Sequence, residues 1–209
     1  MSVYFFYQKV IKKIKQIYFI NFNRLKLKLN GVCFGQKCAL YNSIQIDKSY
    51  NSTIKLGDNV TITSGIGINP LSRNIKAYIR TEKNASIKIG NNSGLSSCCL
   101  WSQNAICIGD NVNIGAGTAI IDTDRHTLDW RVRISKDLMN GEHVDQVLCK
   151  TAPIFIGNNV LVGAYCIILK GVTIGDRAII GAGSIVTHDI PADSIAAGNP
   201  CKVLKHITD

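Results

Sequence analysis

The chain has 209 residues, of which 46% are hydrophobic and 18% charged, a balance that favours one folded domain over a disordered chain. No apolar run approaches the roughly 20 residues that span a bilayer. The N-terminal segment also lacks the layout of a signal peptide, so the sequence predicts a cytoplasmic protein. The net charge is +10, and residues 1–46 carry eight basic residues and no acid. Because the remainder is nearly neutral, nucleic acid is not expected as a partner.

Residues 1–30 are expected to form a basic amphipathic helix. In "VYFFYQKVIKKIKQIYF" the apolar residues recur at positions 3, 7, 10, 14 and 17, and the lysines fall largely off that line. Two interpretations stay open. The helix either covers the end of the adjoining fold or packs between subunits, or it makes a peripheral contact with the anionic inner face of a membrane.

Residues 31–200 contain a repeat of six residues. In "IGNNVLVGAYCIILKGVTIGDRAIIGAGSIV" an Ile or Val returns at every sixth position from Ile156 to Val186, and a small residue follows four positions later. The register extends back to Phe34, with interruptions near 48–55, 69–88 and 127–153. A period of six matches one short strand plus one turn, and three such units close a triangular coil. The sequence therefore predicts an all-β solenoid, a parallel β-helix with the aliphatic residues inside.

The cysteine and histidine patterns do not indicate a metal site. The eight cysteines include no C-x-x-C pair, and Cys38, Cys99 and Cys166 stand where the repeat places a small interior side chain. The four histidines lie far apart in the sequence. We therefore interpret these thiols as compact hydrophobic side chains and expect no metal.

A polar motif, "DTDRHTLDWRVR", stands where the repeat gives way to the predicted loop 127–153. His126 falls six residues after Ile120, at a position that the pattern would fill with an aliphatic residue. Residues alone leave two roles open for it, a general base or a hydrogen-bonding residue that ends a coil. A base needs a partner on its other ring nitrogen. Asp122, Asp124 and Asp129 are the candidates, and the sequence does not choose among them.

Other polar residues of the loop have alternative roles. Trp130 could offer a face to a sugar ring or anchor the loop. Arg131 and Arg133 could contact a phosphate, or they are solvated surface charges.

The stretches "IIDTDRHTLDW" and "VTHDIPADSIAAGNPCKVLK" resemble the hexapeptide-repeat sugar O-acetyltransferases of surface-polysaccharide clusters and the maltose, galactoside and nodulation-factor acetyltransferases. The resemblance covers roughly residues 85–207. It implies a left-handed parallel β-helix, a homotrimer with active sites between subunits, and acetyl-CoA as the acyl donor. It also implies His126 as the catalytic base. Asp122 and Asp124 share strand parity, so both could face the same groove, and we expect them to be the catalytic carboxylates.

The resemblance also implies binding residues. Those matching the coenzyme A positions are Ala164, Ala182, Thr187, His188, Lys202 and Lys205, with His188 standing where the galactoside enzymes have lysine. The acceptor-binding asparagine of the galactoside enzymes has no clear counterpart here, and we assign Ser97, Asp129, Trp130 and Arg133 to the sugar or glycan acceptor. Residues 201–209 form the C-terminal tail.

The function expected from these features is acetyl-CoA-dependent O-acetylation of a sugar hydroxyl in a capsule or O-antigen precursor. One alternative is N-acetylation of a nucleotide-linked amino sugar, which also uses a histidine base. The other is a non-catalytic solenoid scaffold, which would need neither His126 nor the "AAGNPCK" segment.

Overall fold

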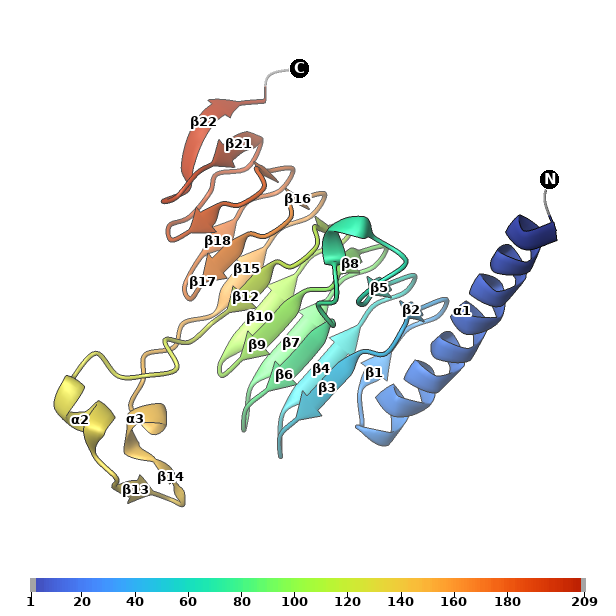
Figure 1. Ribbon diagram of the computed structural model, residues 1–209. Helices are drawn as coiled ribbons and strands as arrows, with labels where there is room; N and C mark the ends of the chain where they lie inside the picture. The colour runs from blue at the N-terminus through green and yellow to red at the C-terminus, as the bar shows by residue number, and fades with distance from the viewer. Residues whose placement is uncertain (1–2, 208–209) are drawn as a thin grey trace.

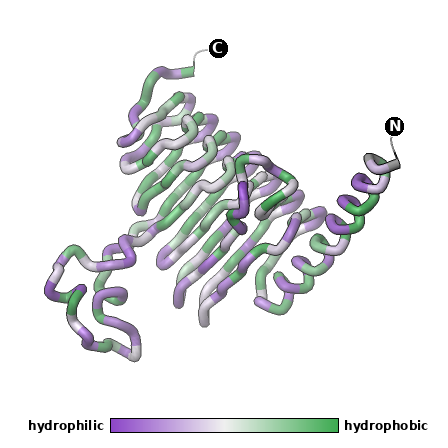
Figure 2. Tube along the Cα trace, in the orientation of Figure 1, coloured by the Kyte–Doolittle hydropathy of each residue, from purple (hydrophilic) through white to green (hydrophobic). Residues whose placement is uncertain are grey.

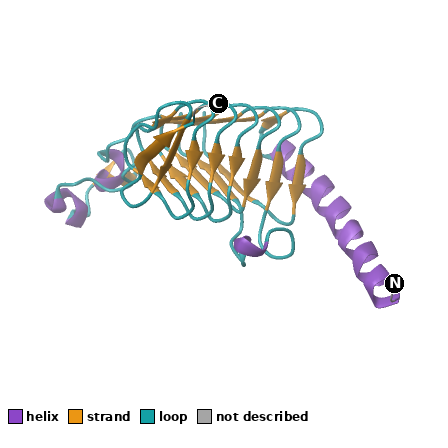
Figure 3. Cartoon of the chain, turned by 90° about the horizontal axis from the view of Figure 1, so that it is seen from above, coloured by secondary structure: helices purple, strands orange, loops and turns teal. Residues whose placement is uncertain are grey.

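The computed structural model describes residues 3–207, so positions 1–2 of the expected helical segment and 208–209 of the expected tail lie outside the described residues. A long helix, α1 (Val3–Leu29), leads into a three-sided solenoid of short strands (Figure 1). A long loop, residues 122–153, leaves the solenoid on the side away from α1, as the view from above also shows (Figure 3). We call this loop the arm.

Three parallel sheets form the sides of the prism, here called A, B and C. Side A contains β1 (Cys33–Phe34), β4 (Thr53–Leu56), β7 (Ser86–Ile89), β10 (Ala105–Ile108), β15 (Ile154–Ile156) and β18 (Thr173–Ile174). Side B contains β2 (Ala39–Tyr41), β5 (Thr61–Thr63), β8 (Gly94–Ser96), β11 (Asn113–Ile114), β16 (Leu161–Val162), β19 (Ile179–Ile180), β21 (Ser194–Ala197) and the antiparallel β22 (Lys202–His206). Side C contains β3 (Gln45–Lys48), β6 (Tyr78–Thr81), β9 (Cys99–Ser102), β12 (Ala119–Ile121), β17 (Ile167–Leu169) and β20 (Ile185–Val186).

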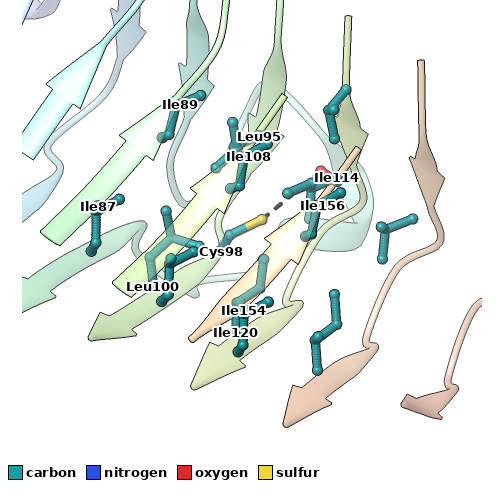
Figure 4. Close-up of a cluster of buried hydrophobic side chains, with 14 of the residues drawn as sticks. Ile87, Ile89, Leu95, Cys98, Leu100, Ile108, Ile114, Ile120, Ile154 and Ile156 are labelled. Atoms are coloured by element: carbon teal, nitrogen blue, oxygen red, sulfur yellow. Dashed lines mark hydrogen bonds between the residues drawn. The ribbon is translucent and has the colours of Figure 1, made fainter. Parts of the chain in front are cut away.

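The hexad positions occupy the interior of the prism, as the repeat predicts. Residues that differ by three hexads lie directly above one another, since three sides make one coil. The pairs in register are Ile156–Ile174 on side A, Val162–Ile180 on side B and Ile168–Val186 on side C. None of these six side chains is more than 3% exposed. Figure 4 shows part of the resulting column of Ile and Leu side chains, whose burial is the main source of stability in such a fold.

Asparagine and glycine shape the corners between the sides. Asn59, Asn92 and Asn111 all have positive φ at the A–B corner, which asparagine tolerates better than most residues. The Asn59 and Asn92 side-chain amides are hydrogen-bonded to each other at 3.0 Å. At the B–C corner a Cβ on Gly115 would come within 2.4 Å of the backbone nitrogen of Ala164. Successive coils therefore approach so closely there that glycine is required.

Two details of the sequence-based register were wrong. The predicted interruption at 48–55 is only a corner between β3 and β4. The interruption predicted at 69–88 lies earlier, at residues 64–77, which contain the short helix η1 (Pro70–Ser72). The interior thiol of the third coil is Cys98, which is 2% exposed, rather than the half-buried Cys99, because the corner between Leu95 and Leu100 is one residue shorter than elsewhere. Burial raises the pKa of the Cys98 thiol to about 12, which keeps it protonated.

The C-terminal part of α1 covers the first coil. The Asn23 side chain donates to the carbonyl of Leu40 at 3.0 Å, Arg24 donates to the carbonyl of Cys38 at 3.0 Å, and Leu27 is fully buried. These contacts cover the edge that the first strands would otherwise expose. The expectation that the helix covers the end of the fold is thus met by its last turns.

The apolar line predicted from the sequence lies on another face of α1. Tyr7, Val10, Ile14 and Ile17 are all exposed, by 40% to 61%. Figure 2 shows hydrophobic and hydrophilic residues alternating along the coils and intermixed along α1. In residues 3–207 no helix combines the length and the apolar character needed to cross a membrane.

Candidate active site

The arm begins and ends at the corner between sides C and A. The chain leaves after β12 and returns at β15, and it forms α2 (Trp130–Ile134), the hairpin strands β13 (Leu138–Met139) and β14 (Glu142–His143), and α3 (Val144–Val147) on the way. Its two legs are joined where Asp124 N donates to the carbonyl of Lys150 at 3.0 Å and Ala152 N donates to that of Asp122 at 3.1 Å. These bonds hold the two ends of the arm together where it meets the solenoid.

A histidine–carboxylate pair lies on the arm. His126, on the outgoing leg, donates from Nδ1 to Oδ2 of Asp145, which stands at the start of α3. The other oxygen, Oδ1, accepts from the backbone N–H of Thr127 at 2.8 Å. Asp145 is 8% exposed, whereas the imidazole is 61% exposed. A buried carboxylate held at both oxygens therefore orients an accessible ring.

The electrostatics of the pair suit proton transfer. The hydrogen bond from His126 lowers the pKa of the Asp145 carboxyl, so the carboxylate stays ionised at neutral pH. Because Nδ1 donates to Asp145, Nε2 is the nitrogen of this exposed ring that can accept the proton of a substrate hydroxyl. The carboxylate also stabilises the imidazolium that proton removal would create.

Asp122 does not orient His126, which corrects the sequence-based expectation. Its side chain is fully buried and accepts hydrogen bonds from Ser102 Oγ at 2.7 Å, from the backbone N–H of Gln103 at 2.7 Å and from that of Asn104 at 3.0 Å. Burial raises the pKa of this carboxyl. Asp122 thus joins two coils at the C–A corner, and strand parity alone misled the prediction.

Asp124 and Asp129 are also engaged away from His126. Asp124 forms a salt bridge with Lys170 at 2.6 Å. Asp129 is the N-cap of α2, accepting from the Arg131 backbone N–H at 2.9 Å, and it pairs with the Arg131 guanidinium, which lowers the pKa of the Asp129 carboxyl. All three acids considered from the sequence are close to His126 along the chain, but the partner arrives from the far end of the arm.

The residues assigned to the acceptor lie in different environments. Ser97 is fully buried, and its hydroxyl accepts from the backbone N–H of Gly65 at 3.0 Å, so the structure does not support it as an acceptor contact. Arg133 donates to the carbonyls of Thr127 and Leu128 at 2.8 and 3.0 Å and thereby closes the first part of the arm.

Trp130 lies on α2 and is 60% exposed, so its indole is available to a ligand. Arg131, whose role the sequence left open, is an exposed surface residue paired with Asp129.

The residues matched to coenzyme A lie in three places. Ala164 and Ala182 are stacked at the B–C corner, because a Cβ on Gly163 would come within 2.4 Å of the backbone nitrogen of Ala182. Ala164 also lines a groove of about 350 Å³ beside the 64–77 excursion.

Thr187 and His188 follow β20 at the C–A corner, where Thr187 Oγ1 and His188 Nδ1 lie 2.8 Å apart. Lys202 and Lys205 are exposed on β22. Since His126 also leaves from the C–A corner, a single chain does not bring it together with Ala164.

Two features of the site were missed at the level of sequence. Asp145 stands in "EHVDQVLCK", where no repeat or spacing distinguishes it from a solvated acid. A polar cleft of about 450 Å³ lies under the arm, lined by the C–A corners of successive coils and by residues that directly adjoin the His126–Asp145 pair. Among the residues that the structure describes, no group of three or more His, Cys, Asp or Glu side chains is arranged to hold a metal ion.

Comparison with known proteins assigns the repeat. Residues 153–188 match the family described as bacterial transferase hexapeptide (six repeats). The chain carries the hexapeptide repeat of the bacterial transferases. Galactoside O-acetyltransferase of Escherichia coli (strain K12) is 44% identical to this hexapeptide-repeat chain over 104 residues, which cover 50% of this chain and 45% of that protein. The hexapeptide-repeat chain thus spans about half the length of this curated relative.

A solved structure resembles the hexapeptide-repeat chain over most of its length. AntD, an N-acyltransferase from Bacillus cereus in complex with dTDP-4-amino-4,6-dideoxyglucose and coenzyme A, has a TM-score of 0.60 at 18% identity, covering 89% of each chain. At that identity the likeness concerns the fold alone. Together with the repeat, it confirms the left-handed parallel β-helix.

Proposed function

We propose that the protein is an acetyl-CoA-dependent O-acetyltransferase that acts on a sugar hydroxyl. The observation that carries the proposal is the pair of His126 and Asp145, a ring accessible to substrate and a buried carboxylate that orients it. The likeness of half of the chain to a galactoside O-acetyltransferase supports oxygen rather than nitrogen as the acceptor atom.

The proposed reaction needs one base and one oxyanion donor. His126 Nε2 takes the proton of the sugar hydroxyl as its oxygen attacks the thioester carbonyl. The carbon–sulfur bond then breaks, and the proton passes from the imidazolium to the leaving thiolate. The products are an acetyl ester and coenzyme A with a free thiol. Asp145 holds the ring throughout and is a positioning residue.

The B–C corner supports a role in binding the thioester. In the described part of the chain, the backbone N–H of Ala164 has no hydrogen-bond acceptor, while its neighbours Gly163 and Tyr165 donate to the carbonyls of Ile180 and Ala116, both at 2.8 Å. A free N–H beside a groove is the kind of donor that stabilises a developing oxyanion. We assign this role to Ala164 and the donor's arm to the groove.

The site requires more than one copy of the chain in this proposal. His126 leaves from the C–A corner and Ala164 lies at the B–C corner, so base and oxyanion donor meet only if the C–A corner of one copy faces the B–C corner of another. A three-sided prism repeated around a threefold axis satisfies this requirement at three equivalent sites. We therefore propose a homotrimer.

The face of α1 that does not contact the solenoid supports a membrane contact. The same helix carries Lys13, as well as Lys12 and Lys15, which flank the space between the helix and the solenoid, and the first 46 residues contain no acid. We place the enzyme at the inner face of a membrane, where precursors of surface polysaccharides are assembled. Replacing the three lysines with glutamine should abolish flotation with anionic vesicles. Unchanged flotation argues against the contact, and a loss of trimers would assign the face to subunit packing.

The function is tested by product analysis. Purified protein is incubated with acetyl-CoA and a panel of neutral, amino and acidic sugars, and the products are identified by mass spectrometry before and after mild alkali. We expect an alkali-labile ester. An alkali-stable amide would establish the N-acetyl alternative, and the absence of both product and thermal stabilisation by acetyl-CoA would favour the scaffold.

A further inference from the structure

The polar cleft under the arm adjoins the proposed base. Arg125, which lines it, directly precedes His126, and Gln146, which also lines it, directly follows Asp145. The returning part of the arm is tied to the solenoid there, because Gln103 Nε2 donates to the carbonyl of Gln146 at 3.2 Å. A group bound in the cleft would therefore be held at a fixed position relative to the His126 ring.

A charged aromatic cluster lies at the cleft, where Arg80, Glu82 and Arg125 line it and surround Trp101. The guanidinium carbons of Arg80 and Arg125 lie 5.0 and 4.3 Å from the centroid of the Trp101 ring. Arg80 and Trp101 are neighbours across side C, in register between β6 and β9. One carboxylate oxygen, Oε1 of Glu82, accepts from Arg80 Nε at 2.9 Å, from Trp101 Nε1 at 3.0 Å and from Arg125 Nη1 at 3.4 Å.

The charges of the cluster do not balance within the cleft. Three cations line it, Arg80, Lys83 and Arg125, against two acids, Glu82 and Glu142, while Arg80 also pairs with Asp47 at 3.5 Å. A guanidinium has more donors than one carboxylate oxygen can accept. In the described residues the Arg125 side chain uses a single nitrogen, Nη1, for Glu82, although only 20% of that side chain is exposed. Among the described residues Asp47 gives Arg80 a second carboxylate, whereas Arg125 is ion-paired with Glu82 alone, so Arg125 is the guanidinium best able to hold a further anion.

Stacking on an indole and pairing with Glu82 fix the orientation of both guanidiniums before any ligand binds. Such a preorganised pair suits a planar or tetrahedral oxyanion, which accepts several hydrogen bonds at once. A cluster that served stability alone would need no opening, yet these side chains are 20% to 32% exposed and border a cleft of about 450 Å³.

We propose that this cleft binds an anionic group of the acceptor, a carboxylate or a phosphate, through Arg80 and Arg125, so that the acceptor is an acidic or a phosphorylated sugar. The inference rests on the proposed function only where it identifies the bound molecule as the acceptor of the acetyl group. The anion site itself depends on the geometry of the cleft alone.

The test uses Trp101 as its own reporter. The chain has two tryptophans, so Trp130→Phe leaves Trp101 as the sole indole. In that background, fluorescence titrations with glucuronate, glucose 1-phosphate and glucose should show saturable changes for one or both anions and none for glucose. Which anion binds distinguishes a carboxylate from a phosphate. Equal responses to all three sugars, or no saturable response to either anion, would overturn the proposal.

Matched variants separate the anion site from other roles. Arg125→Gln should weaken anion binding by about tenfold or more, the loss expected for a charge-assisted hydrogen bond, while Arg131→Gln on the outside of the arm should leave it unchanged. Unaltered anion affinity in Arg125→Gln would contradict the assignment. Stabilisation by acetyl-CoA is measured on the same proteins. Its absence in the unmodified protein would count against acetyl transfer, and the anion result would stand independently.

Discussion

The coils and the arm of this protein are built on different principles. In the coils, each side chain at the hexad position stacks on an equivalent residue of the next coil, such as Ile156 on Ile174, and the same contact recurs along the prism. In the arm, no contact repeats, and the structure depends on individual hydrogen bonds such as that between His126 and Asp145. The comparison teaches that the regular part supplies stability and that the irregular part is free to carry chemistry.

The largest effect is expected from removing the carboxylate of the arm. Asp145→Asn keeps the shape of the side chain but loses the charge that orients His126 and stabilises the imidazolium. We expect the turnover number to fall by about 10²–10⁴-fold with little change in the melting temperature. Steady-state kinetics of coenzyme A release measures it.

Asp124→Asn is the control for that measurement, because Asp124 pairs with Lys170 rather than with His126. A similar loss of turnover in both variants would mean that the arm tolerates no change of charge, and it would remove the special role of Asp145.

Substitutions inside the coils should lower the stability of the protein, whereas those in the arm lower its turnover. Ile174 is 1% exposed in the interior column, so Ile174→Ala leaves a cavity and should lower the free energy of unfolding by about 2–5 kcal/mol. The adjacent Thr173 points outward, and Thr173→Ala should cost less than about 1 kcal/mol. Chemical denaturation compares the two. Equal losses would show that the interior column does not dominate stability.

The close approach of coils at the B–C corner gives a smaller effect. A Cβ on Gly115 would meet the backbone of Ala164, whereas on Gly94 it would meet the Asn113 side chain at 3.0 Å. We expect Gly115→Ala to cost about 1–3 kcal/mol and Gly94→Ala less, since a side chain can move aside. Thermal unfolding measures both, and the reverse order would refute this account of the corner.

The smallest expected effect is a local loss of stability at acidic pH. Since the native pKa of the Asp145 carboxyl is lowered, its contribution to stability is fully present above the unfolded value of about 4 and is lost as the pH falls through the native value. Hydrogen exchange of the Thr127 amide, which donates to Asp145, should therefore lose protection below about pH 4. Protection that persists in acid, or that survives in Asp145→Asn, would contradict the assignment.

The same contrast explains what the sequence could predict. The interior column was readable because one physical requirement, a buried aliphatic side chain at a fixed spacing, recurs from Phe34 to Val186. The interruption at 64–77 was misplaced because Tyr78–Thr81 and Ser86–Ile89 continue the coil as four-residue strands, which are longer than the hexad allows and so break its spacing.

The arm was less predictable. His126 was identifiable because it departs from the repeat. Asp145 lies outside the repeat and so interrupts no pattern, and its role depends on the path that the arm takes back to the solenoid. The Trp101 cluster was invisible for the same reason, since Arg80, Glu82 and Arg125 come together only when coils stack.

The exposed imidazole on the arm is the centre of this account, and one comparison tests it most directly. The rate of coenzyme A release and the free energy of unfolding are measured for His126→Ala and for His143→Ala, an exposed histidine of the same arm. We predict a rate loss of about 10²–10⁴-fold for the first variant alone, with both variants as stable as the unmodified protein. Near-normal release of coenzyme A by His126→Ala would contradict the account, as would a rate loss that follows unfolding.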